Sequence, residues 1–335
     1  MTERAATVMA VVAFVAALNP QPIPLILSLA VGVLALASRR STLVILAVAV
    51  LCSSLAWRSW GGLASEPPTT VDAIATLVTD PVRAGGQTTV VVRVDDTRYL
   101  ASAFGGPAAR LQNATAGERL AVVGSSKPYN GSRERKAALH VADRLTIQSF
   151  EHLGGTSPPW VMANAIRSTI DAGANSLGED QKALFTGLVY GDDRNQAPRT
   201  EVDFRLVGLT HLLAVSGQNV AYVLTVLGPA IRRYSVAGRW LTTLAVLGVF
   251  ATATRFEPSV LRATVMASLA VTARVVGRDV PTSRLLAVAV TLLLMVDPLL
   301  AETIAFRLSV AASAGIVWLS KPIERRLRGA DWLRA

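Results

Sequence analysis

Long apolar runs dominate both ends of the chain, and a polar region separates them. The runs have transmembrane or near-transmembrane length, and a soluble domain does not contain so many of them. The pattern therefore predicts a polytopic α-helical membrane protein with about eight membrane segments. These segments cover residues 5–18, 23–37, 42–57, 204–231, 240–254, 259–276, 285–296 and 303–319.

A polar, strand-rich insert occupies residues 61–159. Alternating or β-branched runs predict five short strands, which clusters of Gly, Pro, Asn and Asp separate. Five strands in a segment of this length fit a small β-barrel, and a barrel of the OB type has that strand count. We therefore predict an inserted OB-like domain. Its strands are expected over residues 70–79, 88–94, 98–103, 119–124 and 139–150.

Two amphipathic segments follow the insert. Residues 160–177 carry apolar side chains at every fourth position, while Arg167 and Asp171 lie off that face. This helix either lies in the membrane interface or packs on protein. A second amphipathic helix is expected over residues 179–190. The chain thus divides into N-terminal transmembrane helices (1–60), the barrel (61–159), amphipathic or interfacial helices (160–200) and a C-terminal transmembrane region (201–335).

The basic residues indicate how the chain is oriented. The formal net charge is +10, and the cytoplasmic loops of membrane proteins collect Lys and Arg. If each run spans once, the basic clusters all fall on one side. We therefore expect a cytoplasmic N-terminus, an uncleaved first segment and an extracytoplasmic barrel. The clusters are Arg39-Arg40, Arg232-Arg233 with Arg239, Arg274 with Arg278 and Arg284, and Lys321 with Arg325, Arg326 and Arg328.

The apolar run 204–231 contains a cluster of polar residues in its middle, namely His211, Ser216, Gly217, Gln218 and Asn219. Polar groups at bilayer depth are costly and usually face a protein interior or a water-filled cavity. Ser216-Gly217 is a natural helix break, with Asn219 as the expected N-cap of a half-helix whose positive end favours anions. The alternative is that these side chains only hydrogen-bond between helices and hold the bundle together.

Two further arginines, Arg262 and Arg307, lie within expected membrane helices. Arg262 follows Arg255 and Glu257, and Pro258 suits a helix start, so Arg262 is expected about one turn inside the membrane. It could snorkel to the interface, pair with Glu257, or line a cationic vestibule for phosphates. The same three interpretations apply to Arg307.

The barrel is not strongly basic overall, because ten Lys/Arg face nine Asp/Glu between residues 66 and 159. A local basic cluster is formed by Arg133, Arg135 and Lys136 beside Tyr129. These residues are candidates for contacting a nucleic-acid backbone and stacking a base. The alternative is an ordinary solvated loop.

The sequence contains no recognisable catalytic motif. It has no GxSxG, Walker A, HEXXH or HxHxDH pattern, and its three histidines are far apart. His211 and Ser216 are five residues apart, so a continuous helix would place them roughly 140° from each other. Cys52 is the only cysteine. We therefore expect no enzymatic activity, no metal site and no cofactor.

Several motifs resemble the ComEC family of bacterial competence DNA-uptake channel proteins. The strongest match is Gly208-Leu-Thr-His-Leu-Leu-Ala-Val-Ser-Gly217, followed by Gln218-Asn219. Supporting matches are Leu188-Val-Tyr-Gly-Asp-Asp-Arg194, Pro258-Ser-Val-Leu-Arg-Ala-Thr-Val-Met-Ala267 and Phe306-Arg-Leu-Ser309 ahead of Ala314-Gly315. The order of N-terminal helices, external barrel and helical region is also similar to that family.

The resemblance implies import of single-stranded DNA across the bacterial cytoplasmic membrane during natural transformation. It implies a DNA path lined by the polar cluster of residues 211–219 with Arg262 and Arg307, and other competence proteins as partners: an external DNA receptor and a separate nuclease or ATPase. The family often has a His after Ser-Gly, where this chain has Gln218-Asn219. The chain resembles a short form without the metallo-β-lactamase-like nuclease domain, so region 201–335 is expected to be an incomplete competence domain. The alternatives are a structural or assembly subunit of a split or remnant uptake system, and a transporter of another anionic substrate.

Overall fold

The computed structural model describes residues 2–38, 40–64, 69–192, 194–209 and 215–328. Its contacts divide the chain into two compact units, which are described separately. The first unit joins Met1–Gly61 to Val265–Ala335, and the second is Gly62–Thr264. These units are defined by contacts in the structure, whereas the four segments expected from the sequence are defined by composition. The division into four segments stays a prediction.

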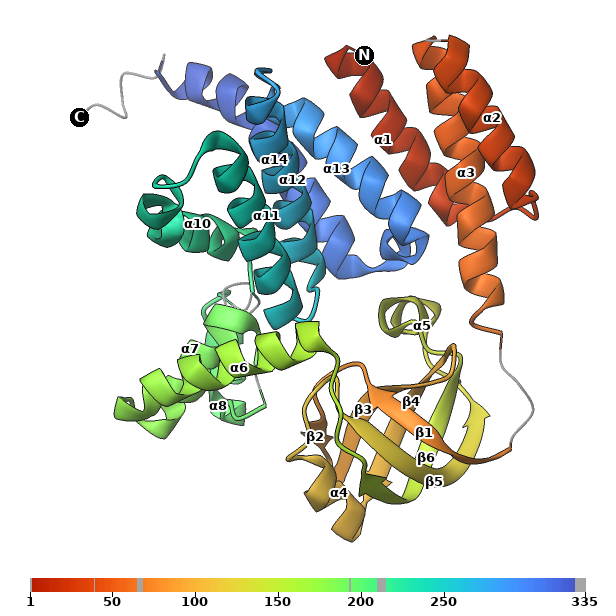
Figure 1. Cartoon of the computed structure of the whole chain (residues 1–335), viewed down its shortest axis with the longest axis vertical. Helices are drawn as coiled ribbons and strands as arrows, with labels where there is room; N and C mark the ends of the chain where they lie inside the picture. Colours follow the sequence, from red (N-terminus) through yellow and green to blue (C-terminus); the bar gives the residue numbers. More distant parts are fainter. Residues whose placement is uncertain (1, 39, 65–68, 193, 210–214, 329–335) are drawn as a thin grey trace. The chain divides into compact units, whose positions relative to one another are not determined.

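Three N-terminal helices form one part of the first unit (Figure 1): α1 (Glu3–Leu18), α2 (Leu25–Ser38) and α3 (Ser41–Gly61). The proline-rich turn between α1 and α2 is fixed by serines of α3. Ser53 Oγ donates to the carbonyl of Asn19 at 2.6 Å, and Ser54 Oγ donates to that of Ile23 at 2.7 Å. These bonds satisfy backbone acceptors that the prolines leave without helical partners. The expected helices of the N-terminal region are therefore present.

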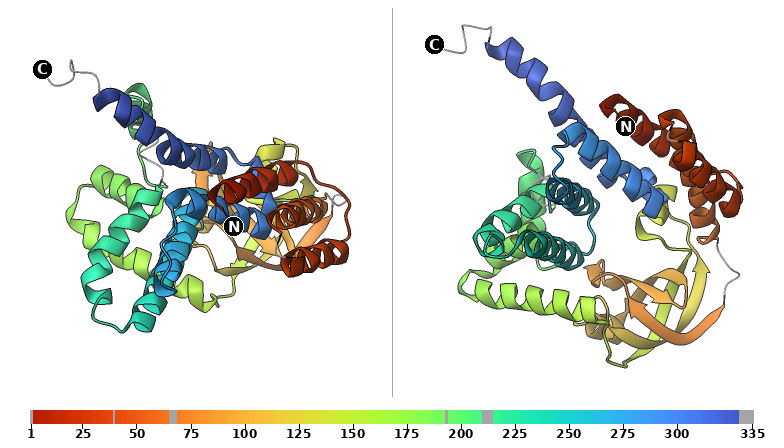
Figure 2. Two further views of the ribbon diagram at one scale, coloured as in Figure 1. Left: turned by 90° about the horizontal axis from the view of Figure 1, so that it is seen from above. Right: turned by 45° about the horizontal axis from the view of Figure 1, so that its top comes forward.

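The C-terminal helices complete the first unit. They are α13 (Thr282–Val296), the 3₁₀ turn η2 (Pro298–Glu302) and α14 (Ile304–Arg328), with most of α12 (Pro258–Val275). Helix α1 packs against both α3 and α13, as the views in Figure 2 also show. The N-terminal helices and the last helices of the chain are therefore neighbours, although the whole second unit separates them in sequence.

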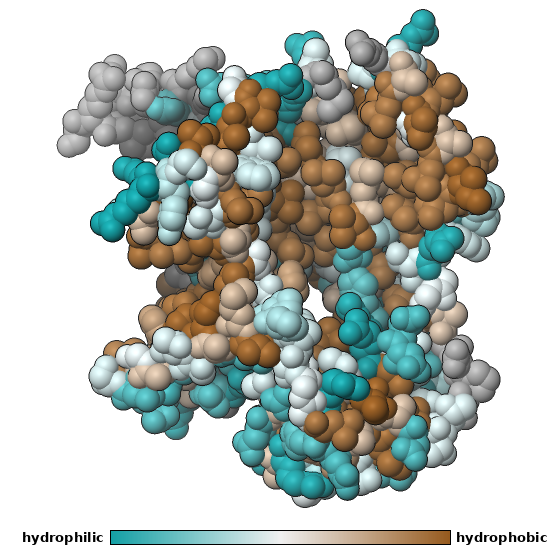
Figure 3. Space-filling view, viewed as in Figure 1, coloured by the Kyte–Doolittle hydropathy of each residue, from teal (hydrophilic) through white to brown (hydrophobic). Residues whose placement is uncertain are grey.

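Two helices in the described part of the chain are long and apolar enough to cross a membrane, namely α3 and α11 (Val236–Ala253). Shorter apolar helices are α2, α13 and residues 304–320. On α2, Ile26 is 83% exposed and Val33 69% exposed, and Figure 3 shows apolar side chains covering the region of α2 and α3. Such contiguous apolar surface is typical of a lipid-facing helix. The expected number of eight membrane segments is not established.

The second unit begins with a closed β-barrel, as the sequence predicts. The strands run in the order β1-β5-β6-β4-β3, and β3 pairs again with β1, so the sheet closes on itself. The β4–β6 pair is parallel, the other pairs are antiparallel, and the short strand β2 adds to β3. The strands are β1 (Thr70–Leu77), β2 (Val82–Ala84), β3 (Gln87–Val94), β4 (Thr97–Phe104), β5 (Arg119–Pro128) and β6 (Asp143–His152).

The alternation of side chains fills the barrel interior. Val90, Val92 and Val94 of β3 point inward and join Leu120 and Leu145 in one buried cluster. Helix α4 (Gly105–Leu111) packs on β3, β4 and β6 and contributes two apolar side chains to that cluster. Gly105, with φ of +58°, begins α4, which separates β4 from β5. The five expected strands are confirmed, and β2 is additional.

The remaining helices of the second unit carry the candidate site. They are α5 (Arg133–Leu139), α6 (Pro158–Gly173), α7 (Glu179–Tyr190), α8 (Pro198–Leu206), α10 (Gly217–Ile231), α11 and the first turns of α12. Helix α6 packs along α11, and α10 also contacts α11. The apolar run 204–231 is not one helix, because α8 ends at Leu206 and α10 begins at Gly217. Arg167, expected off the packed face of α6, is buried with 6% of its surface exposed.

Candidate nucleic-acid path and its ionic support

The start of α10 lies where the sequence predicts a helix break. Ser216 is the N-cap, and its Oγ accepts a hydrogen bond from the backbone N–H of Gln218 at 3.3 Å. Asn219, expected as the cap, instead donates from Nδ2 to the carbonyl of Leu188 at 2.6 Å. Serine is as good an N-cap as asparagine, so Asn219 is free to bind the end of α7. We call residues 216–219 the α10 start.

The first turn of α12 packs directly on the α10 start. Ser259 Oγ donates to the carbonyl of Val215 at 2.6 Å. A Cβ added to Gly217 would lie 2.9 Å from Ala263 Cβ and 3.5 Å from Arg262 Nη2. Glycine at this position therefore permits a close approach of the two helices. It also brings the guanidinium of Arg262 beside the positive end of α10.

The end of α7 is the third segment at this place. Gly191 ends α7 in the left-handed conformation with φ of 82°, which glycine adopts without strain. A Cβ on Gly191 would lie 2.9 Å from Val215 Cγ2. Together with the bond from Asn219 to Leu188, this contact joins α7 to the α10 start. Three stretches that are distant in sequence, around residues 191, 217 and 262, thus meet.

The predicted path residues differ in their exposure to solvent. Gln218 is exposed, whereas Ser216, Gly217, Asn219 and Arg262 are half-buried. The amide of Gln218 is hydrogen-bonded to the hydroxyl of Tyr222 one turn further along α10. His211 lies outside the described residues.

A buried ionic cluster adjoins this place, and its centre is Asp80, which follows β1. Arg255 binds both carboxylate oxygens of Asp80, with Nη2–Oδ1 at 2.8 Å and Nε–Oδ2 at 3.0 Å. Arg167 Nη1 donates to Oδ2 at 2.6 Å, and the backbone N–H of Ala116 donates to Oδ1 at 2.9 Å. Two-pronged contacts of this kind are the strong form of an arginine–carboxylate pair. The Asp80 carboxylate thus connects the barrel to α6 and to the end of α11.

Arg167 extends the cluster from Asp80 to the loop after α7. Its Nη2 donates to Asp192 Oδ2 at 2.9 Å, and Arg194 binds both oxygens of the same carboxylate. Arg167 also lies 4.5 Å above the ring of Tyr190. We call Asp80, Arg167, Asp192, Arg194 and Arg255 the Asp80 network. Three guanidinium groups and two carboxylates of these residues are largely buried together.

The network changes the acidity of its aspartates. Burial alone would raise the pKa of Asp80, but the bonds and charges of Arg255 and Arg167 outweigh it and hold this pKa well below the usual range. Burial opposes the arginines at Asp192 too, and Arg194 and Arg167 lower its pKa. Both carboxylates are therefore ionised at neutral pH. Loss of one partner of such a buried ion pair strongly destabilises the folded protein.

The depressed pKa values predict how stability depends on pH. Each aspartate binds its proton more weakly in the folded state, so its contribution to stability is complete above the unfolded pKa of about 3.9. That contribution is lost as the pH falls below this value toward the folded pKa. Purified protein in detergent should therefore keep a constant thermal midpoint from about pH 8 to pH 5 and lose stability below about pH 4. A large fall between pH 7 and pH 5 would contradict this assignment.

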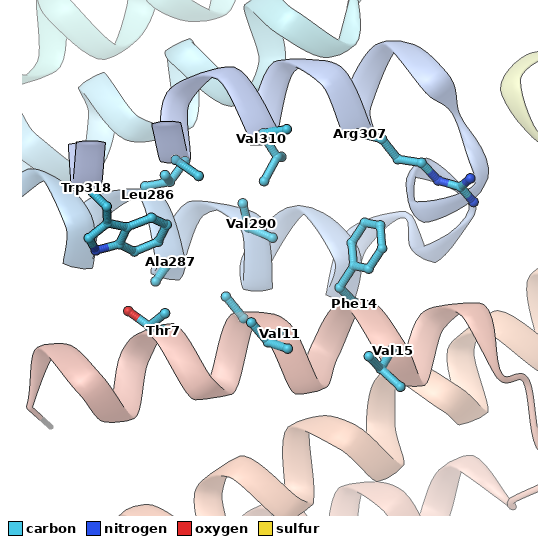
Figure 4. Close-up of a pocket in the computed structure, with 13 residues that line it drawn as sticks. Thr7, Val11, Phe14, Val15, Leu286, Ala287, Val290, Arg307, Val310 and Trp318 are labelled. Carbon is cyan, nitrogen blue, oxygen red and sulfur yellow. The ribbon is translucent and has the colours of Figure 1, made fainter. Parts of the chain in front are cut away.

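Arg307 belongs to the first unit and has its own surroundings. Its Nε donates to the carbonyl of Ala301 at 2.6 Å, and Nη2 lies 3.4 Å from Glu302 Oε2. Of the three interpretations, these contacts agree with pairing to a neighbouring acid. The side chain lies at one end of an apolar cavity of about 290 Å³ between α1, α13 and α14, with Phe14 and Trp318 among its lining residues (Figure 4).

The basic cluster of the barrel is helical, because α5 begins at Arg133 after the N-cap Ser132. Arg133 and Arg135 are exposed and Lys136 is half-buried. Tyr129 is only 7% exposed and packs with Val91, Leu100 and Val141. The expected stacking of a base on Tyr129 is therefore corrected: the ring is part of a small core, and the surface at this place is formed by α5.

Several residues of the Asp80 network are absent from the sequence-based candidates. Asp80-Pro81 has the composition of an ordinary turn, and Arg167 is predicted to lie off the packed face of its helix. The pairing of Asp80 with Arg255 joins residues 175 positions apart. A single sequence carries no signal for such a pair. Asp192 and Arg194 do carry one, since both lie in a motif that resembles the ComEC family.

Comparison with known proteins gives one match. The model of a protein family described as "Competence protein" matches residues 188–335. Comparison with curated proteins and with solved structures gives no match. The matched region starts at the end of α7 and includes α10, α11 and α12, so it contains the three stretches that meet at the α10 start.

The match agrees with the resemblance of the motifs to the ComEC family. Proteins of the competence family are membrane proteins, and the two membrane-length helices in the described part of this chain agree with that location. The family also indicates a role in DNA uptake for competence. Residues 188–335 thus match the model of the competence protein family, in agreement with the suspected ComEC family.

Proposed function

We propose that the chain is a membrane channel component that imports single-stranded DNA across the bacterial cytoplasmic membrane during natural transformation. The observation that carries the proposal is the meeting of three competence motifs at the α10 start, with Arg262 beside Gly217. A helix N-terminus with an adjacent guanidinium attracts anions, and the DNA backbone carries one phosphate per nucleotide. No catalytic step is assigned to the chain.

In this proposal the path uses Ser216, Gly217, Gln218 and Arg262, with His211 preceding them in sequence. The exposed amide of Gln218 and the half-buried guanidinium of Arg262 would contact phosphates as the strand passes. Arg307 would contribute charge in the first unit, although its guanidinium already binds Ala301 and Glu302. The energy for transport would come from a partner such as an ATPase.

The barrel would receive the strand on the extracytoplasmic side. We propose an OB-type barrel, supported by the five strands that close the ring, the parallel β4–β6 pair and helix α4 between β4 and β5. Besides α5, Arg93, Lys127 and Arg144 are exposed on its wall. Arg144 and Lys127 are register partners on neighbouring strands. Basic side chains on α5 and neighbouring strands suit a phosphate backbone better than they suit base-specific contacts.

The membrane topology in this proposal has eight segments, a cytoplasmic N-terminus and an external barrel. Its support is the consistent side on which the basic clusters fall and the exposed apolar side chains of α2. Other competence proteins, including an external DNA receptor and a separate nuclease, would complete the system.

Uptake of labelled DNA by competent cells tests the proposed function. Arg262→Leu should reduce internalised single-stranded DNA at least tenfold at normal protein level, because it removes the cation beside the α10 start. Arg83→Leu, which removes an exposed barrel charge, should leave uptake close to normal. Normal uptake by the Arg262→Leu cells, with the protein present in the membrane, would refute the proposed path.

A second candidate function is favoured by one observation. The Asn219 amide donates a hydrogen bond to the carbonyl of Leu188 and so links α10 to α7. This is the behaviour expected of a structural or assembly subunit whose polar residues only hold helices together. Under this alternative, Asn219→Leu would lower the amount of folded protein, and Arg262→Leu would affect neither protein level nor uptake.

A further inference from the structure

We infer that Asp80 of the barrel is a positioning residue for the α10 start. The inference rests on the proposed function, because that function makes the α10 start part of the DNA path. The contacts that join Asp80 to the α10 start do not depend on DNA. Asp80 contacts none of residues 216–219 in the described structure. It acts through the arginines that its carboxylate holds, and two separate routes lead from it to the α10 start.

The first route passes through Arg255 into α12. Arg255 and Phe256 have φ of 55° and 59°, a left-handed conformation that non-glycine residues rarely adopt. Two such residues in succession persist only where the surroundings fix them. Here the Asp80 carboxylate holds the Arg255 guanidinium, which also lies 5.0 Å from the Trp160 ring. Phe256 packs edge-to-face on the same Trp160 ring.

That strained turn leads directly into the first turn of α12. Pro258 begins the helix, and Ser259 then binds the carbonyl of Val215. Arg262 and Ala263, one turn later, pack on Gly217. The direction of the turn at Arg255 therefore decides where the Arg262 guanidinium lies relative to the positive end of α10.

The second route passes through Arg167 and the loop after α7. Arg167 bridges Asp80 to Asp192, which immediately follows Gly191. Gly191 packs on Val215, and Asn219 binds the carbonyl of Leu188 in the last turn of α7. The end of α7 is thus held from Asp80 on one side and contacts the α10 start on the other.

Both routes depend on one carboxylate. Without the charge of Asp80, the three guanidinium groups of the network would share only the carboxylate of Asp192, and their mutual repulsion would no longer be balanced. Among the described residues, the carboxylate that Arg255 contacts is that of Asp80, and its other side-chain hydrogen bond goes to the neutral amide oxygen of Asn164 at 2.8 Å. The Asp80 carboxylate thereby links the barrel to both segments that contact the α10 start.

The test is a distance measurement in the full-length protein. Spin labels are placed at Asp96→Cys on the barrel and Gln218→Cys on α10, in a chain in which Cys52→Ser removes the native thiol. Asp80→Asn should shift or broaden the distance distribution and reduce DNA uptake. Asp80→Glu should restore a narrow distribution and part of the uptake, since it keeps the charge. Asp72→Asn, the same change on the exposed side of β1, should alter neither.

If Asp80→Asn yields no folded protein, Arg255→Lys carries the same test, because it keeps the charge but loses the two-pronged contact. It should broaden the distribution without removing the protein. An unchanged distribution in a folded Asp80→Asn or Arg255→Lys protein would overturn the inference, whatever happens to uptake. A changed distribution with normal uptake would leave Asp80 as a positioning residue and contradict the proposed path instead.

Discussion

Replacing Gly217 by valine should abolish most DNA uptake by cells that carry this protein. A side chain at residue 217 would begin 2.9 Å from Ala263 Cβ, so α10 and α12 must move apart. Forcing extra atoms into such a contact costs about 1–3 kcal/mol. Because 1.4 kcal/mol corresponds to a factor of ten, we expect uptake to fall about fivefold or more. Internalised labelled DNA, normalised to the amount of protein in the membrane, is the measurement.

The neighbouring helix α11 offers a matched control for this substitution. Gly248 lies in α11, and a Cβ added there meets nothing within 4 Å. Gly248→Val therefore makes the same chemical change in an apolar helix without a clash, and uptake should stay within about twofold of normal because no contact is disturbed. Equal effects of the two substitutions would show that the close approach at Gly217 is not what matters.

Arg167→Met should strongly destabilise the second unit. Arg167 is 6% exposed and bridges two carboxylates, so its loss leaves Asp80 and Asp192 partly uncompensated in a buried place. Removing one partner of a buried ion pair costs about 3–5 kcal/mol. For a domain of this size we expect the thermal midpoint of purified protein in detergent to fall by on the order of 10 °C.

Arg83→Met is the control for that experiment. Arg83 is an exposed arginine on β2, so its replacement removes the same charge from the same unit without burying an unpaired acid. Its thermal midpoint should stay within about 1–2 °C of the native value, as for most surface substitutions. A midpoint for Arg167→Met as high as that of Arg83→Met would show that the network contributes little to stability.

Much of the secondary structure follows from periodicity and turn chemistry. The second amphipathic helix is present as Glu179–Tyr190, and Gly191 ends it in the left-handed conformation that favours glycine. The five main strands lie where alternation predicts them, because one face of each must fill the barrel. The helix break before Gly217 follows from the Ser-Gly pair.

The sequence is less informative where distant residues decide the outcome. In the sequence, a tyrosine beside basic residues is typical of a surface residue that stacks a base. In the structure, Val91 and Leu100 of neighbouring strands bury the ring of Tyr129. Arg167 is polar on an amphipathic helix, yet two aspartates from other segments allow it to be buried. Asn219 is a good helix cap that was displaced by Ser216, three residues earlier. Each case depends on partners that local patterns cannot reveal.

Cysteine accessibility along α10 tests the central claim most directly. Single cysteines are placed at residue 216 and at residues 218–223 in the Cys52→Ser chain and treated in competent cells with a water-soluble thiol reagent, with and without added DNA. The account predicts labelling on one helical stripe that includes residue 218 and protection of that stripe while DNA passes. Absence of labelling at every position, or labelling that DNA leaves unchanged, would contradict a DNA path at the α10 start.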